Sequence, residues 1–559
     1  MNTLAVGTKN AQSSRVATRQ PKSQVKSIAL RVFIIGLSIT VSFTVVAVQL
    51  IRLAVIGQNR QNTNTSQTIG EFYSRPDIVD RHGRLLATDI ALPALFADSH
   101  LITSVDETIE SIKNIFPELN TTKVRRALSD KNRRYYLLKR AVAPRVAETI
   151  NAMGLPGLGF RSEPKRKYPN VRLAGHLLGY VDSYNYGVTG VEHLLNRNKG
   201  VRRVDHATVN TASPLRLTID VRTQYALERE LIAGIKKFKA KAATGVLFEV
   251  QNGEIWAAAS LPGVEPANIN EMMDRSRRDR LASDAFELGS VFRLFTLAMV
   301  MDLDIVTPKA LVDVTNPIKI ESFVISDENP FAGKLSLEQI MIRSSNVGSG
   351  ILAEATGSER QHSFFERIGL TRAINREDIK TISPVLPKTW GAAETVSIGF
   401  GYGIAVSPLQ FAVVFGSMVN GGISIIPTLI LQPSNRVFSK QQLIRAKTSS
   451  RLRDMLRQNV LDGRGWRANV VGYRVGGITG TADLANDVNY EGNSVITSFA
   501  ATFPIDKPRF ALMITFFDPQ PKGTKAMRSA ENTAAPVAGE VIRRVAPLVG
   551  VEKRAEMRG

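Results

Sequence analysis

The 559-residue chain contains no cysteine. Disulfide bonds, thiolate metal sites and a cysteine nucleophile are therefore excluded. This composition suits an oxidising envelope compartment, although many cytosolic proteins also lack cysteine. The chain has no zinc-finger spacing and no basic run interleaved with aromatic residues, so its formal charge of +22 does not indicate nucleic-acid binding. The remaining interpretations of the charge are anionic lipid headgroups and a basic soluble surface.

Acidic residues are absent from positions 1–31, which carry only basic charges, and residues 32–51 carry no charge at all. A helix of 20 residues spans about 30 Å, the thickness of a bilayer core. We therefore predict a basic, disordered cytoplasmic tail at 1–31 and a single transmembrane anchor at 32–51, with the rest of the chain outside the cytoplasm. A cleaved signal peptide is the alternative. The apolar run is longer than a typical signal core, and no clear small-x-small cleavage site follows it.

The length is too great for one hydrophobic core and indicates at least two domains. Residues 52–220 mix strand-like and helical patterns, whereas residues 221–548 form a second unit, followed by a short tail at 549–559. In the second unit, hydrophobic periodicity predicts strands at residues 244–250, 255–259, 473–478, 496–503 and 509–517. It predicts helices at residues 221–238, 291–301, 335–343 and 534–546. This order favours an α+β fold, with an antiparallel sheet covered by helices.

Ser290 follows a glycine and begins the apolar run that is predicted to form the second helix. A serine at a helix start is usually an N-cap, but it can also be a nucleophile assisted by the backbone N–H groups of that helix end. Arg293 lies three residues later and therefore on the same face. Because a buried guanidinium without a partner is very costly, we expect both side chains to face a polar cleft.

Two further segments are weak signals when each is taken alone. Ser344-Ser345-Asn346 follows the predicted helix at 335–343, and Ile478-Thr479-Gly480-Thr481 continues the strand that begins at residue 473. In this chain order, the three segments resemble the S-x-x-K, S-x-N and K-T-G motifs of penicillin-recognising serine acyltransferases. Arg293 and Ile478 stand where that pattern has lysines.

The resemblance extends over nearly the whole chain and is closest to the class B penicillin-binding proteins, in particular the division-specific peptidoglycan D,D-transpeptidases that act in septum formation. The segments that carry it are RPDIVDRHG at 75–83, RKYP at 166–169, GVTGVE at 187–192, LTID at 217–220, ELGS at 287–290, GYGIAVSPLQ at 401–410 and VGGITGTAD at 475–483. It implies a transmembrane anchor, a pedestal domain at 52–220 and a transpeptidase domain at 221–548. It also implies an inner-membrane, single-pass protein with a periplasmic catalytic domain.

The resemblance implies the following roles for the residues at the matching positions. Ser290 would attack the D-Ala-D-Ala carbonyl of a stem peptide, and a β-lactam would acylate the same serine. Ser344 would relay a proton and Asn346 would hold the substrate amide. The hydroxyls of Thr479 and Thr481, on either side of Gly480, would bind the substrate carboxylate.

The resemblance also gives the N–H groups of Ser290 and Thr481 as the oxyanion hole. No metal ion or organic cofactor is implied. The implied partners are peptidoglycan stem peptides, the membrane, a polytopic glycosyltransferase and other division proteins.

The two departures from the pattern bear directly on activity. From reference pKa values, deprotonation at pH 7 costs about 4–5 kcal/mol for lysine and about 7–9 kcal/mol for arginine, so Arg293 is a poor general base. Ile478 removes a positive charge and a proton-relay partner for Ser344. Lys309, Lys334 and Lys388 are other lysines of the domain that the sequence cannot place. Two hypotheses follow: a slow transpeptidase with an altered base, and a catalytically inactive relative that acts as a division scaffold or binding module.

Overall fold

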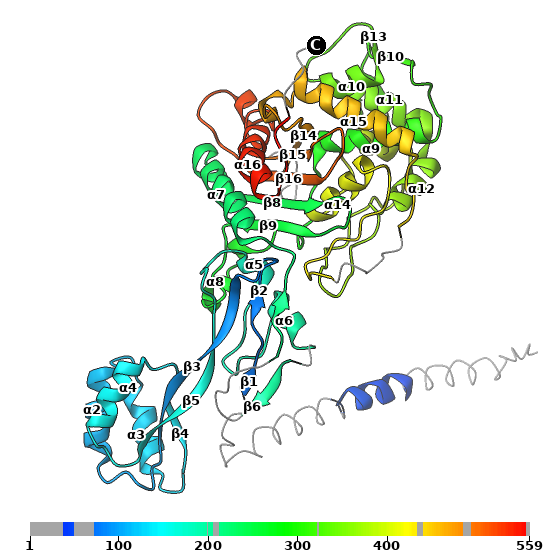
Figure 1. The fold of residues 1–559 in the computed structure, drawn as a ribbon. Helices are drawn as coiled ribbons and strands as arrows, with labels where there is room; N and C mark the ends of the chain where they lie inside the picture. The colour runs from blue at the N-terminus through cyan, green and yellow to red at the C-terminus, as the bar shows by residue number, and fades with distance from the viewer. Residues whose placement is uncertain are drawn as a thin grey trace, which may run out of the picture.

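The computed structural model describes residues 37–47, 49, 72–197, 200–204, 212–320, 323–432, 440–484 and 494–554 (Figure 1). The predicted tail at 1–31 and part of the predicted anchor at 32–51 lie outside these residues. Within the anchor, residues 37–47 and 49 are helical, with exposed apolar side chains such as Phe43. None of the helices in the described ranges combines the length and the apolarity that crossing a bilayer requires.

The pedestal, here residues 72–220, is built on the long strands β3 (Leu85–Ala97) and β5 (Leu158–Lys167), which pair antiparallel. Its other strands are β1 (Phe72–Ser74), β2 (Ile78–Val79), β4 (Tyr136–Lys139), β6 (Arg202–Val204) and β7 (Leu215–Arg216). Its helices are α2 (Val105–Ile115), α3 (Thr121–Ser129), α4 (Pro144–Ala152), α5 (Gly175–Leu178) and α6 (Gly190–Leu195). Helices α2, α3 and α4 gather at the far end of the pedestal in Figure 1, whereas α5 lies next to the second domain.

A buried ion-pair network joins three of the sequence motifs inside the pedestal. Glu192 receives hydrogen bonds from Nε of Arg75 at 2.8 Å and from Nε of Arg166 at 2.7 Å, and all three side chains are buried. Arg166 also pairs with Asp89 at 3.1 Å. Removing one partner would leave an uncompensated buried charge, so these motif residues hold the pedestal together.

The turn at residues 80–83 connects the pedestal to the second domain. Oδ1 of Asp80 accepts hydrogen bonds from the N–H groups of His82 and Arg84, and its Oδ2 accepts one from Val221 N at 3.2 Å. The Arg81 guanidinium lies 3.4 Å from the ring centroid of Trp256 in the neighbouring sheet. This tight loop joins β2 to β3, and it also fixes the start of the first helix of the second domain.

The second domain contains a five-stranded antiparallel sheet in the order β14-β15-β16-β8-β9. The strands are β8 (Ala242–Glu249), β9 (Ile255–Leu261), β14 (Gly476–Asp483), β15 (Val495–Phe503) and β16 (Phe510–Phe517). Helices α7 (Val221–Phe238) and α16 (Ala534–Leu548) share one apolar core with the sheet. A second core contains α9 (Arg293–Asp302) and α14 (Pro408–Val419). The predicted sheet-and-helix fold is therefore confirmed.

The helical part of this domain lies beside β14 (Figure 1). Its further helices are α10 (Leu337–Arg343), α11 (Asn346–Thr356), α12 (Ser358–Ile368), α13 (Ala392–Gly399) and α15 (Ala446–Leu461), and α8 (Ile269–Met272) lies near the pedestal. Its short strands are β10 (Leu311–Asp313), β11 (Ile318–Ile320), β12 (Phe323–Ile325) and β13 (Lys334–Ser336). Short 3₁₀ turns occur at Arg275–Arg277, Gly289–Phe292, Trp466–Ala468 and Lys525–Arg528.

Several predicted boundaries differ from the structure by a few residues, and three of the differences have a clear local cause. The strand predicted from residue 473 begins at Gly476, because Arg474 has a positive φ of 45°. The helix predicted at 335–343 begins at Leu337, since Ser336 is its N-cap and forms a capping box with Gln339. Helix α16 continues past Pro547 to Leu548, because a proline in the last turn removes only its own N–H donor.

Candidate active site

Ser290 is held at the edge of the sheet by close backbone contacts. It lies in the 3₁₀ turn η2 (Gly289–Phe292), which leads into α9. Gly289 has a φ of +62°, and a Cβ there would lie 2.4 Å from the carbonyl oxygen of Thr481. Gly401 has a φ of +102°, and a Cβ there would lie 1.9 Å from the carbonyl oxygen of Gly289. Only glycine fits these positions, so the turn is fixed against strand β14.

Arg293 brings the first two motif segments together. Its Nη2 donates hydrogen bonds to Ser290 Oγ at 3.0 Å and to Asn346 Oδ1 at 2.7 Å, and its Nη1 donates to Ser344 Oγ at 2.6 Å. The arginine is 1% exposed, whereas Ser290, Ser344 and Asn346 are half-buried. The N-cap interpretation of Ser290 is wrong, since the hydroxyl makes no capping bond and instead accepts from Arg293.

Within the described ranges, no lysine is hydrogen-bonded to Ser290, Ser344 or Asn346. Lys309, Lys334 and Lys388 therefore do not replace the missing lysines in this arrangement. Among the described residues, the cation that is hydrogen-bonded to Ser290, Ser344 and Asn346 is the guanidinium of Arg293.

The second segment is positioned by a carboxylate that lies outside the three motif segments. Asp327 accepts hydrogen bonds from Ser345 Oγ at 2.6 Å and from Val347 N at 3.0 Å, at the start of α11. Asn346 Nδ2 donates to the carbonyl of the neighbouring Ser326 at 3.3 Å. The loop after β12 therefore fixes the S-x-N segment and places a negative charge near Arg293.

The third segment forms part of β14, which lies at the end of the strand order and pairs with β15 in the described sheet. A Cβ on Gly480 would lie 2.5 Å from Leu288 O, so β14 passes directly against the turn that carries Ser290. Ile478 shares the Gly480 face of the strand because side chains alternate. It is 2% exposed and belongs to the apolar core.

The two threonines of this segment lie on the other face of β14. Thr481 Oγ1 accepts a hydrogen bond from Ala530 N at 3.0 Å and keeps its own hydrogen for donation. Thr481 is half-buried, and Thr479 is buried. Of the two hydroxyls, that of Thr481 is thus the more accessible to a ligand.

Burial lowers the pKa of Arg293 to about 9, with Asp327 opposing this shift and Arg464 adding to it. Nε of Arg293 is also buried without an acceptor in the described part of the chain. At pH 7 the neutral form then costs about 3 kcal/mol, compared with about 7–9 kcal/mol from the reference pKa. Burial thus makes the guanidinium of Arg293 a stronger acid, but it does not make the side chain neutral at pH 7.

The geometry favours stabilisation of the negative charge that develops during acyl transfer, but it hinders removal of the serine proton. A fixed cation 3.0 Å from Ser290 Oγ can stabilise a developing alkoxide or a bound anion. Because Arg293 donates to Ser290, it cannot accept the serine proton while it remains protonated. The amide oxygen of Asn346 is already engaged by the same guanidinium. The site is therefore preorganised electrostatically, but none of the described side chains hydrogen-bonded to Ser290 is a neutral base at pH 7.

An antiparallel sheet covered by helices, with a serine turn, an S-x-N segment and a T-G-T strand meeting at one edge, defines the class of penicillin-recognising serine acyltransferases. Residues 243–543 match the family model described as the penicillin binding protein transpeptidase domain, and residues 73–202 match the penicillin-binding protein dimerisation domain. The chain belongs to the penicillin-binding protein transpeptidase family, and its two matched domains are arranged as in class B members.

The relatives support this assignment over most of the chain. The chain is 32% identical over 500 residues to the probable peptidoglycan D,D-transpeptidase FtsI of Caulobacter vibrioides, covering 87% of this chain and 83% of that protein. It is 29% identical over 476 residues to the peptidoglycan D,D-transpeptidase FtsI of Escherichia coli K12, covering 80% of this chain and 79% of that protein. The structure of a peptidoglycan synthetase from Bifidobacterium adolescentis shares the fold, with a TM-score of 0.68, 21% identity, and coverage of 88% of this chain and 98% of that chain.

Proposed function

We propose that this penicillin-binding transpeptidase homologue forms a Ser290 acyl-enzyme slowly, from D-Ala-D-Ala stem peptides and from β-lactams. The observation that carries the proposal is the set of three hydrogen bonds from Arg293 to Ser290, Ser344 and Asn346. These bonds keep the nucleophile and the S-x-N side chains in one arrangement. The same bonds leave the serine proton without an acceptor at neutral pH, and this limits the rate.

In the proposed reaction, Ser290 Oγ attacks the carbonyl carbon of the penultimate D-alanine and loses its proton. The peptide bond to the terminal D-alanine breaks, and the departing amine takes a proton. The amine of a second stem peptide then attacks the ester carbonyl, forms the cross-link and returns the serine to its hydroxyl form. With a β-lactam, the ring amide opens in the first step and the ester persists.

Substrate binding is assigned to the surrounding polar groups. Asn346 would hold the substrate amide through Nδ2, because its Oδ1 is used by Arg293. The Thr481 hydroxyl, with Thr479 beside it on the strand, would bind the terminal carboxylate. The N–H groups of Ser290 and Thr481 would form the oxyanion hole.

A second candidate is a relative that binds stem peptides or β-lactams without acylation and serves as a division scaffold. Two observations favour it specifically: the buried guanidinium of Arg293 is predominantly charged at neutral pH, and the apolar Ile478 is buried where the family motif has a lysine. Both features are compatible with ligand binding and unfavourable for proton transfer.

Labelling of the full chain by a fluorescent penicillin separates the two candidates, with Ser290→Ala as the matched control. We expect weak covalent labelling of the native chain and none of the alanine variant. We also expect the double variant Arg293→Lys, Ile478→Lys to label much faster. If the native chain is never labelled and the double variant is, the native chain is a binding module and the acyl-enzyme proposal is wrong.

We further propose that the protein is anchored in the inner membrane by residues 32–51 and acts at the division septum. The uncharged run after a basic segment supports the anchor, and the resemblance to division-specific transpeptidases supports the septal site. A fluorescent fusion should collect at midcell, and deletion of residues 1–51 should release the protein from the membrane fraction. A uniform envelope distribution would contradict the septal role, and a truncated protein that stays in the membrane fraction would reveal a second attachment.

A further inference from the structure

The substrate carboxylate has no cation at the position where the family motif places one. Ile478 of β14 is buried and apolar. Arg293 cannot take the place of the missing lysine, because its side chain is 1% exposed and both of its Nη atoms donate to Ser290 and the S-x-N side chains. Since charged donors form the strongest hydrogen bonds to carboxylates, a cation from another segment would strengthen substrate binding.

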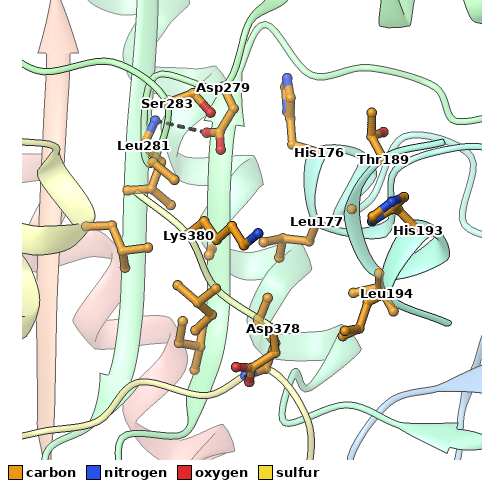
Figure 2. Close-up of a pocket in the computed structure, with 18 of the residues that line it drawn as sticks. His176, Leu177, Thr189, His193, Leu194, Asp279, Leu281, Ser283, Asp378 and Lys380 are labelled. Carbon is orange, nitrogen blue, oxygen red and sulfur yellow. Dashed lines mark hydrogen bonds between the residues drawn. The ribbon is translucent and has the colours of Figure 1, made fainter. Parts of the chain in front are cut away.

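The cavity shown in Figure 2 does not supply this cation. It has a volume of about 430 Å³ and lies between helices α5 and α6 of the pedestal and strand β9. None of the described residues that line it belongs to the three motif segments around Ser290. The cavity is therefore separate from the acyl-transfer site.

Arg464 lies in the loop that connects α15 to β14. The loop folds back on the last turn of α15, where Asn459 O accepts hydrogen bonds from the N–H groups of Gly463 and Gly465, both at 3.1 Å. The side chain of Asn459 is buried and donates to Gly477 O at 2.8 Å. Asn459 thus ties the backbone on both sides of Arg464 to the start of β14.

The guanidinium of Arg464 contacts the loop that fixes the S-x-N segment. Its Nη1 donates to Glu328 Oε2 at 2.6 Å. Glu328 follows Asp327, whose carboxylate holds the start of α11. Burial lowers the pKa of Arg293, and the positive charge of Arg464 adds to this shift, because nearby cations repel each other. Arg464 therefore lies between the start of β14 and the S-x-N segment, within electrostatic range of the site.

The ion pair with Glu328 leaves Arg464 available to a ligand. The Glu328 side chain is 68% exposed and that of Arg464 is 25% exposed, and partly solvated pairs of this kind are weak. Nη2 and Nε of Arg464 have no hydrogen-bond partner among the described residues. These two N–H groups point the same way on the planar guanidinium and match the two oxygens of a carboxylate.

We propose that Arg464 binds the carboxylate of the stem peptide or β-lactam and supplies the positive charge that is absent at Ile478. Nε and Nη2 donate to the carboxylate oxygens, which adds a charged donor to the hydroxyl of Thr481. Glu328 competes with the ligand for the same guanidinium. The proposal rests on the function proposed above, because it concerns the carboxylate of that substrate, but it describes binding and does not require acylation.

The test measures peptide binding to the full chain carrying Ser290→Ala, in lipid nanodiscs, so that acylation cannot occur. The two probes are diacetyl-L-lysyl-D-alanyl-D-alanine and the same peptide with a C-terminal amide. Calorimetric titration should show tighter binding of the carboxylate peptide. Adding Arg464→Gln should weaken carboxylate binding about tenfold, the size of one hydrogen bond to a charged group, and should leave amide binding nearly unchanged.

Three further variants in the same background separate recognition of charge from a structural role. Arg467→Gln is the matched control, since Arg467 is an exposed arginine that follows the same loop and stacks on the ring of Trp466, and its loss should change neither probe. Arg464→Lys keeps the charge and should retain most of the preference for the carboxylate. Glu328→Gln removes the competing carboxylate and should strengthen carboxylate binding about two- to fivefold.

Three results would overturn the proposal. One is the absence of saturable binding of the carboxylate peptide at millimolar concentration. Another is a preference for the carboxylate that Arg464→Gln does not reduce relative to Arg467→Gln. The third is a Glu328→Gln variant that binds both peptides as weakly as Arg464→Gln does, because the ion pair would then only hold two loops together. If the preference is intact but the native chain is never acylated, the acyl-enzyme proposal alone is wrong.

Discussion

The protonation state of Arg293 gives the sharpest prediction, because the acylation rate should depend on pH through this one side chain. Only the neutral guanidine can accept the Ser290 proton, so the reactive fraction grows as pH rises toward the pKa of Arg293. With a pKa of about 9, roughly one molecule in a hundred is neutral at pH 7 and half are neutral at pH 9. The second-order rate constant of acylation should therefore rise about fiftyfold between pH 7 and 9 and level off above it.

The assay is time-resolved labelling by a fluorescent penicillin from pH 6.5 to 10, corrected for spontaneous hydrolysis of the β-lactam. Arg293→Met is the control, since it removes the titrating group and leaves Ser290 in place. Its rate should follow hydroxide concentration without a plateau. A native profile that is flat between pH 7 and 9, or that matches Arg293→Met, would refute the assignment of Arg293 as the group that limits proton transfer.

Three further predictions concern the residues around this side chain. Arg293→Lys combined with Ile478→Lys should raise the acylation rate constant at pH 7 by about two orders of magnitude, the lower end of what a positioned base contributes. An unchanged rate would show that proton transfer is not limiting. Asp327→Ala should lower the free energy of unfolding by about 2 kcal/mol in denaturant titration, because it removes two hydrogen bonds to a charged acceptor. An unaltered unfolding midpoint would contradict the role of Asp327 in fixing the S-x-N segment. Gly401→Ala should destabilise the chain by at least about 2 kcal/mol more than the control Gly421→Ala. Gly421 has a similar positive φ, but open space surrounds the position of its Cβ. Equal losses of stability would mean that the close backbone contact at Gly401 has no effect.

Local signals in the sequence were sufficient to predict the main helices and strands of the second domain. Helix α7 has the predicted bounds because Asp220 caps it, accepting from the N–H groups of Arg222 and Thr223, and because its apolar residues recur on one face. The hairpin of β8 and β9 follows from the turn at Asn252 and Gly253. These features depend on residues that are close in the chain.

The site could be predicted only in outline. The side chains of Ser290 and Arg293 share a helical spacing, so their common orientation was predictable, but the partners of Arg293 lie about fifty residues away. Asp327 gave no motif signal, because its contacts with Ser345 and Val347 arise only after the loop that follows β12 packs on α11.

The central claim is that Ser290 still forms an acyl-enzyme despite the arginine at 293 and the isoleucine at 478. The most direct measurement is the intact mass of the full chain after incubation with benzylpenicillin at pH 9, alongside Ser290→Ala. We predict a mass increase equal to one penicillin on the native chain and no increase on the alanine variant. An unmodified native chain, with the double lysine variant modified under the same conditions, would contradict the claim.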